Sequence, residues 1–292
     1  MIAAVVAIAA SVLLGTAFVL QQRAAGRMPA RDGLSPRLLV DLVVEPVWLS
    51  GIALMIGGQL LGATALGLAS LSVVEPLLST NLLVALAIAW WASRRRWAPR
   101  DVVAAVALTL GVAGFVLAAH PGASSAHATS GRSLAYVGVV MVPVLACVVA
   151  GRRATGRPRG VALSAAAGLL FGLQDGLTRQ LLSQLAQRGP VAVLISWTGY
   201  TLLGTAVVGL LLAQSAFQAA PLAASLPPMT VAEPLIGIGY GVGVFGEPLR
   251  LTPLWLPCEM MALVVMVAGL VAVSRSPVLT RAHRDHGARL DG

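Results

Sequence analysis

Nine long apolar segments constrain this chain more than any other feature of its sequence. They occupy approximately residues 2–21, 46–66, 72–92, 101–119, 133–150, 161–183, 191–213, 224–246 and 255–274. A helix crosses the bilayer core, about 30 Å thick, with roughly 20 apolar residues. Hydrophobic residues make up 58% of the chain and charged residues 11%, unlike the composition of a soluble domain. We therefore expect an all-α membrane protein with about nine transmembrane helices.

The arginines predict how these segments are oriented. Three arginines lie in the loops of one side, and four follow each of segments one, three, five and nine: Arg23, Arg27, Arg31 and Arg37; Arg94, Arg95, Arg96 and Arg100; Arg152, Arg153, Arg157 and Arg159; Arg275, Arg281, Arg284 and Arg289. By the positive-inside rule, we expect a multi-pass protein of the cytoplasmic membrane with its N-terminus outside and its C-terminus in the cytoplasm. Because the basic residues are not gathered on one face or arm, a nucleic-acid partner is not expected.

An internal repeat divides the chain. Glu75-Pro76-Leu77 returns as Glu233-Pro234-Leu235, and Gly15 matches Gly172 at nearly the same separation. Matching segments are five crossings apart. Because each crossing reverses the direction of the chain, two segments separated by an odd number of crossings are inserted in opposite directions. We expect an inverted repeat, in which segments one to four and six to nine enclose a site near the midplane.

The repeat also predicts the domain organisation. We expect a first repeat at 1–119, a linker with the fifth segment at 120–159, a second repeat at 160–274 and a disordered cytoplasmic tail at 275–292. A short surface helix is expected near Leu38–Val44, between the first two crossings.

Asp175 is the strongest candidate for a functional residue. It lies about 14 residues into the sixth segment, roughly 20 Å from the cytoplasmic end at 1.5 Å per residue. Ionisable groups at such depth are costly and are functional candidates by default. Arg179 lies four positions later on the same helical face. Asp175 is either a proton or cation site, with its charge state held by Arg179, or half of a structural ion pair.

Glu75 and Glu233 allow two interpretations. Ser72-x-x-Glu75 and Thr230-x-x-Glu233 both fit the capping box, which would place each glutamate at a helix start. The alternative is a symmetric pair of gates or ion ligands. The proline pair Pro227-Pro228 is expected to interrupt any helix that begins at Pro221.

Four further polar side chains lie at transmembrane depth: Gln59, Asn81, Gln174 and Tyr240. They could line a transport path, but hydrogen bonds between helices explain them equally well. The sequence contains no GK[ST], HExxH or GxSxG motif and no paired-cysteine motif. We therefore expect neither an enzyme nor a cofactor.

Several stretches carry a resemblance to a known family: Leu14 to Gln22, Ile56 to Gln59, Ser72 to Leu78, Leu110 to Phe115, Gly168 to Gly172 and Val231 to Glu247. They resemble the drug/metabolite transporter (EamA-like) superfamily, whose fold consists of inverted helical repeats. The similarity is greatest to its nine-span NIPA-type branch, whose members are described as magnesium transporters. The resemblance spans nearly all residues before the tail and assigns no magnesium ligand.

The expected function is secondary transport of a small solute or metabolite by alternating access. Mg²⁺ is the leading alternative substrate, and a membrane scaffold without transport is the second alternative. The lipid bilayer is the expected partner, and a homodimer is compatible with the sequence. The direction of transport, the coupling ion and any metal ligands stay open.

Overall fold

The computed structural model describes residues 2–29, 34–68, 77–78, 80–92, 99–118, 129–246 and 255–274. Regular structure in these residues is helical. The helices are α1 (Ile2–Ala25), α2 (Pro36–Val43), α3 (Pro46–Leu68), α5 (Asn81–Ala92), α6 (Pro99–Ala118), α7 (Ser130–Arg153), α8 (Gly156–Arg188), α9 (Pro190–Leu194), α10 (Trp197–Ala219), α11 (Leu222–Phe245) and α12 (Trp255–Ser274). The expected tail at 275–292 lies outside the described residues.

Six of the described helices are long and apolar enough to cross a membrane, namely α1, α3, α7, α8, α10 and α11. Shorter apolar stretches occupy Asn81–Ala92 in α5, Val102–Phe115 in α6 and Met260–Ala272 in α12. Each of these helices overlaps one of the expected apolar segments. The all-α, multi-pass membrane character expected from the sequence is therefore confirmed.

In the N-terminal part, α1 packs against α3 and α5. A Cβ added at Gly58 of α3 would lie 2.7 Å from Leu14 Cγ, and one at Gly51 would lie 3.0 Å from Gln21 Cγ. Since the later residue of α1 meets the earlier residue of α3, these helices are antiparallel. Thr80, just before α5, donates a 3.0 Å hydrogen bond to Ser11, and Asn81 O lies against Gly15. The chain direction of α5 is thus parallel to that of α1.

In the C-terminal part, α8 packs against α10 and α11. Gly168 lies against Met229 and Gly172 lies against Glu233, so α8 and α11 are parallel. Gln174 donates to Thr205 O at 3.3 Å and Gln184 donates to Thr198 at 3.2 Å. These two bonds make α10 antiparallel to α8. Small residues allow such close approach between helices in lipid, where apolar burial alone does not drive association.

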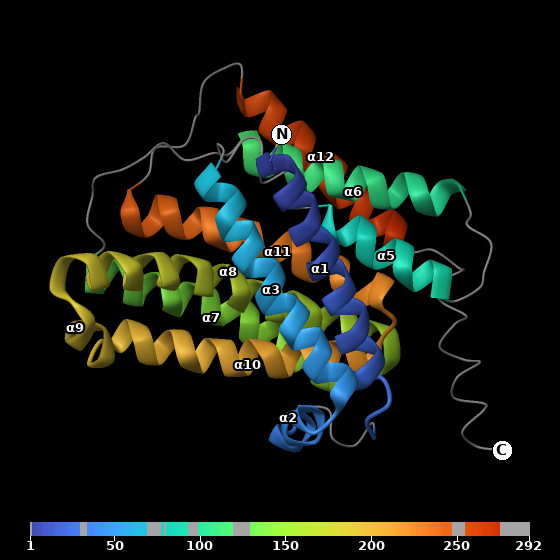
Figure 1. Cartoon of the computed structure of the whole chain (residues 1–292), viewed down its shortest axis with the longest axis horizontal. Coiled ribbons are helices and arrows are strands. Elements are labelled where there is room, and N and C mark those ends of the chain that lie inside the picture. Colours follow the sequence, from blue (N-terminus) through green and yellow to red (C-terminus); the bar gives the residue numbers. More distant parts are fainter. Residues whose placement is uncertain are drawn as a thin grey trace.

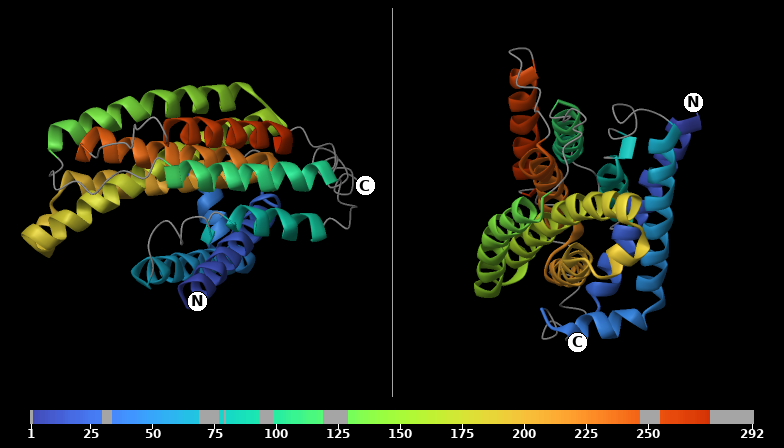
Figure 2. Two further views of the ribbon diagram at one scale, coloured as in Figure 1. Left: turned by 90° about the horizontal axis from the view of Figure 1, so that it is seen from above. Right: turned by 90° about the vertical axis from the view of Figure 1, so that its left-hand side faces the viewer.

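The helices form two groups in space. Figure 2 shows α1 and α3 together on one side, away from α7. In Figure 1 these two helices cross α8 and α10 at a steep angle. The fourth and ninth expected crossings, α6 and α12, pack against each other. A Cβ at Gly269 would lie 2.5 Å from Leu108 N, and Gly111 lies against Met266, so α6 and α12 are antiparallel.

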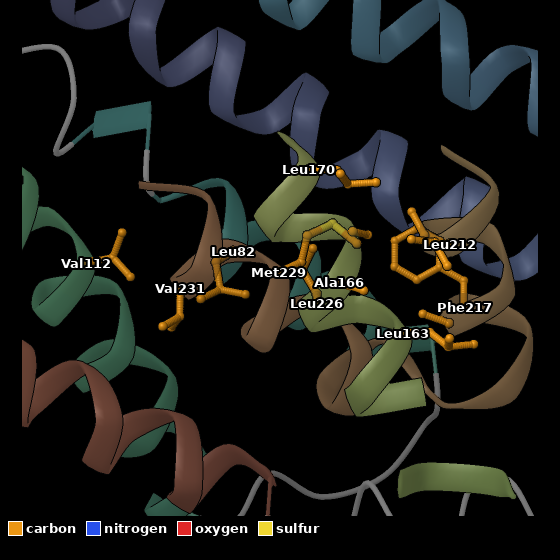
Figure 3. Close-up of a cluster of buried hydrophobic side chains, with 14 of the residues drawn as sticks. Leu82, Val112, Leu163, Ala166, Leu170, Leu212, Phe217, Leu226, Met229 and Val231 are labelled. Carbon is orange, nitrogen blue, oxygen red and sulfur yellow. The ribbon is translucent and has the colours of Figure 1, made fainter. Parts of the chain in front are cut away.

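A buried apolar cluster joins both parts of the chain (Figure 3). Leu82 of α5 and Val112 of α6 belong to it, together with Leu170, Met229 and other side chains of α8, α10 and α11. Because residues far apart in sequence share this cluster, the two parts fold onto each other rather than forming separate units.

One local expectation is confirmed and one is wrong. The short helix between the first two crossings exists as α2, capped by Ser35, whose Oγ accepts from Arg37 N. By contrast, α11 is helical through Pro227, Pro228 and Pro234. Each proline leaves the carbonyl four residues earlier without a helical N–H donor, but membrane helices tolerate this because neighbouring groups can satisfy those carbonyls.

Candidate functional site

The seam between α8 and α11 positions the candidate site. Small residues recur every fourth position on α8, from Gly160 through Ser164, Gly168 and Gly172 to Gly176. Gly172 lies directly against the carbonyl oxygen of Glu233, and Gly176 lies directly under the ring of Tyr240. A Cβ at either glycine would occupy the space of these atoms. The absence of side chains at Gly168 and Gly172 therefore brings the backbones of α8 and α11 into contact.

Asp175 lies beside this seam. Its side chain is exposed on α8, and a Cβ added at Gly237 of α11 would lie 3.8 Å from Asp175 Oδ2. Glu233 lies one turn before Gly237 on the same face of α11 and is half-buried. The structure thus brings Asp175 next to the α11 face that carries Glu233.

Arg179 follows Asp175 by one turn of α8 and is also exposed. Its guanidinium carbon lies 4.7 Å from the centroid of the Phe245 ring, at the end of α11. A guanidinium over an aromatic face is attracted by the negative π surface of the ring. Arg179 therefore connects α8 to the end of α11, one turn of α8 beyond Asp175. Its expected pairing with Asp175 stays a prediction.

A buried polar cluster lies at the same end of α8. Gln180 Oε1 accepts hydrogen bonds from Tyr240 OH and, at 3.0 Å, from Ser133 Oγ of α7. Tyr136 OH donates to Ile236 O at 2.9 Å, and the Tyr136 and Tyr240 rings meet edge to face at 5.2 Å. These bonds fasten α7 to α8 and α11. Tyr240 is consequently a structural residue in this arrangement rather than part of an open path.

Sequence reasoning missed Gln180, Ser133 and Tyr136. One signal could have found Gln180, because it continues the four-residue spacing of Gly168, Gly172 and Gly176 by one further step. Ser133 and Tyr136 carry no such spacing signal, since α7 meets this cluster only through the tertiary fold.

The capping interpretation of Glu233 is wrong. α11 begins at Leu222, so Glu233 lies three turns inside the helix. Thr230 does not cap a helix, and its hydroxyl instead donates to Leu226 O at 3.1 Å within α11. The proline at 234 suggested a helix start, but the helix continues through it. Glu75 and its cap Ser72 lie outside the described residues.

The remaining candidates do not gather with Asp175 into one site. Gln174 faces α10, where it donates to Thr205 O. Asn81 begins α5 and is half-buried against Gly15 of α1, while Gln59 is exposed on α3. Among the residues that the structure describes, no group of three His, Cys, Asp or Glu side chains is close enough to hold a metal ion.

The chemistry available at the site is that of two carboxylates and one guanidinium on neighbouring turns of α8 and α11. A carboxylate in an apolar segment can take up a proton when its surroundings disfavour the charge, or keep the charge beside a cation. Asp175 and Glu233 can therefore bind and release a proton or a cationic group, provided that water or substrate reaches them.

Comparison with known proteins finds a relative that matches nearly the whole chain. The chain is 25% identical over 279 residues to an uncharacterized protein of Corynebacterium glutamicum, and the match covers 96% of each chain. No protein-family model matches the sequence. No solved structure matches it either.

Proposed function

We propose that this protein is a secondary transporter of the cytoplasmic membrane, similar to the drug/metabolite transporter superfamily, that moves a small solute or metabolite by alternating access. The observation that carries the proposal is the opposite direction of the first helix in each half. Phe18 near the end of α1 stacks on Phe217 near the end of α10, and Gly160 near the start of α8 also meets the end of α10 at Ala220. Consequently α1 ends where α8 begins.

The packing pattern within each half supports the same proposal. The first helix of each half is antiparallel to the second and parallel to the third, as α1 is to α3 and α5, and as α8 is to α10 and α11. The fourth helices, α6 and α12, are antiparallel to each other. Two copies of one arrangement facing opposite ways are typical of transporters whose halves rock around a central site. Nine crossings, with four in each half and one between them, would place the two halves in this relation.

Asp175 is the proposed coupling or substrate group. Its position is occupied by Phe18 in the first half, so only the second half contributes a carboxylate there. An exposed acid beside the α8–α11 seam can exchange a proton when the halves move, or bind a cationic group of the solute. Arg179 follows one turn later on α8 and is the proposed partner of the acid.

The test is flux through proteoliposomes that contain the purified chain. We expect uptake of a member of an organic solute panel, together with proton movement reported by an internal pH dye. Asp175→Asn should lower the flux at least tenfold. The control Asp41→Asn removes an exposed carboxylate from α2, outside the apolar segments, and should leave the flux unchanged.

Two outcomes would overturn this assignment. Uptake of Mg²⁺ without uptake of any organic solute would favour the magnesium alternative. Absence of flux for Mg²⁺, protons and the whole panel, in protein shown to be folded, would favour a scaffold. Equal flux in Asp175→Asn and wild type would remove Asp175 from the mechanism but leave transport intact.

A further inference from the structure

Helices α1 and α10, from different halves, share a buried amide pair at one end of the molecule. Gln214 Nε2 donates to Gln21 Oε1 at 2.8 Å, and the two side chains are 0% and 2% exposed. Gln21 in turn donates to Met55 Sδ of α3 at 3.6 Å. The second amide oxygen, Gln214 Oε1, is buried and has no hydrogen-bond partner among the residues that the structure describes. A polar pair this deeply buried is costly to leave incomplete, so its presence between two halves needs an explanation.

The next turn of α10 continues this contact. Gln218 Nε2 donates to the carbonyl oxygens of Met28 and Pro29, at 3.2 and 2.8 Å. Ser215 Oγ accepts from Leu34 N at 3.0 Å. Leu34 has a φ of 63°, a left-handed conformation that is disfavoured for leucine. The hydrogen bond to Ser215 thus holds the entrance to α2 in a strained backbone.

Apolar contacts complete what we call the inter-half bridge, made by Gln21, Met28, Pro29 and Leu34 on one side and Gln214, Ser215 and Gln218 on the other. Phe18 and Phe217 stack edge to face at 6.4 Å beside it. Leu38 and Leu42 of α2 are buried in a small cluster, against which Leu210 and Leu211 of α10 pack. The bridge therefore ties α1, α2 and α10 together at one end.

The arginines locate this end. Arg23, Arg27 and Arg37 flank the bridge in the first half, and Arg157 and Arg159 lie at the start of α8, which meets the end of α10. By the positive-inside rule this is the cytoplasmic end. At the other end of α8, Ser133, Gln180 and Tyr240 join α7, the helix between the two repeats, to α8 and α11. We take α7 to move with the second half as one rigid body.

We propose that the inter-half bridge is the cytoplasmic gate, closed in this structure, and that its hydrogen bonds break and reform in each transport cycle. The proposal rests on the proposed transport function and adds the residues that control access. Side-chain amides suit this role because water can replace each partner when the halves separate. The strained Leu34 lowers the cost of release, because its backbone relaxes when the bond to Ser215 breaks.

Cross-linking tests the gate directly. Cys147 and Cys258 are first changed to Ser, and Gln21→Cys/Gln214→Cys is then introduced. Oxidation should abolish flux through proteoliposomes, and a reductant should restore it. The matched pair Ser133→Cys/Gln180→Cys joins α7 to α8 within one body, so its oxidation should leave flux unchanged. Full flux through the oxidised Gln21→Cys/Gln214→Cys protein would overturn the proposal.

A second measurement needs no substrate. Ser215 is 1% exposed in this structure. In the same cysteine-free background, Ser215→Cys should therefore react slowly with a membrane-impermeant maleimide on the cytoplasmic side. Adding Gln214→Leu should raise the labelling rate about five- to tenfold, the factor expected for about one hydrogen bond lost. Equal labelling rates of Ser215→Cys with and without Gln214→Leu would overturn the proposal that the bridge is a gate. Faster labelling without any flux would support the opening of the bridge and refute transport instead.

Discussion

The two halves use similar helix directions but different seams. In the second half, α8 carries the small residues, and Gly168, Gly172 and Gly176 bring its backbone onto α11. In the first half, the close contacts of α1 are divided between its own Gly15 and two glycines of α3, Gly51 and Gly58, which receive Gln21 and Leu14 as knobs. The second seam is backbone on backbone at Gly168 and Gly172 and meets the Tyr240 ring at Gly176, whereas much of the first seam is side chain into groove.

This difference indicates in which half the helix packing can change more easily. A backbone contact leaves no rotamer that could change to admit an added atom, whereas a leucine or glutamine knob can rotate away. Hydrogen bonds around Gln180 further fasten the second seam. We therefore expect the α8–α11 seam to behave as the rigid part, and the helices around α1 to tolerate more change.

Gly172→Val should give the largest effect. Its side chain would collide with the Glu233 carbonyl, so we expect at least about 3 kcal/mol of destabilisation, or failure to fold. Unfolding in mixed micelles, or the yield of monodisperse protein, measures this. The control Gly138→Val lies on α7, where an added Cβ meets no atom of the described part of the chain within 4 Å. Equal stability of the two variants would contradict a backbone seam.

Gln180→Leu should rank second. It removes the acceptor that Ser133 and Tyr240 share. Ser133 keeps its 3.1 Å bond to Thr129 O, so the cost of about 2 kcal/mol comes mainly from the buried Tyr240 hydroxyl that loses its acceptor. The control Gln187→Leu changes an exposed glutamine of the same helix, which bonds only Ser183 in the described contacts. If both variants unfold at the same detergent concentration, the cluster does not stabilise the second half.

Gly15→Ala should cost about 1 kcal/mol, less than Gly172→Ala measured in the same way. A Cβ at Gly15 would lie 2.6 Å from Asn81 O and 2.9 Å from Ala85 N. Both atoms belong to the beginning of α5, which can shift more easily than the interior of α11. A loss at Gly15 as large as that at Gly172 would show that the two seams are equally rigid.

Tyr136→Phe should have the smallest effect. It removes one hydrogen bond to Ile236 O but keeps the ring against Tyr240, and interhelical bonds of this kind contribute about 0.6 kcal/mol in membrane proteins. The change in unfolding midpoint should be detectable only in paired measurements. A loss of stability larger than that of Gln180→Leu would show that Tyr136, rather than Gln180, contributes most to the stability of the cluster.

The approximate positions of the long described helices were predictable, because a continuous apolar stretch marks each of them. The short helix α2 was predictable for the same kind of reason, since its apolar residues recur at helical spacing. The continuity of α11 through Thr230 was not predictable, because the capping pattern around Glu233 is local, whereas packing against α8 carries α11 through three prolines. The partners of Gln21 and Gln180 lie 193 and 60 positions away, at Gln214 and Tyr240, and no local pattern reports them.

The composition of α8 and α11 has a consequence for biogenesis. Of the six described helices that are apolar enough to span a membrane, these two have the lowest hydropathy. Alone in lipid, each would present glycine-exposed backbone and a carboxylate to hydrocarbon, which the translocon partitions poorly. Since α8 and α11 cover each other's glycine-exposed backbone, α8 should leave the translocon stably only after α11 has been synthesised, about 60 residues later. Truncation of nascent chains between them should therefore leave α8 extractable by alkali.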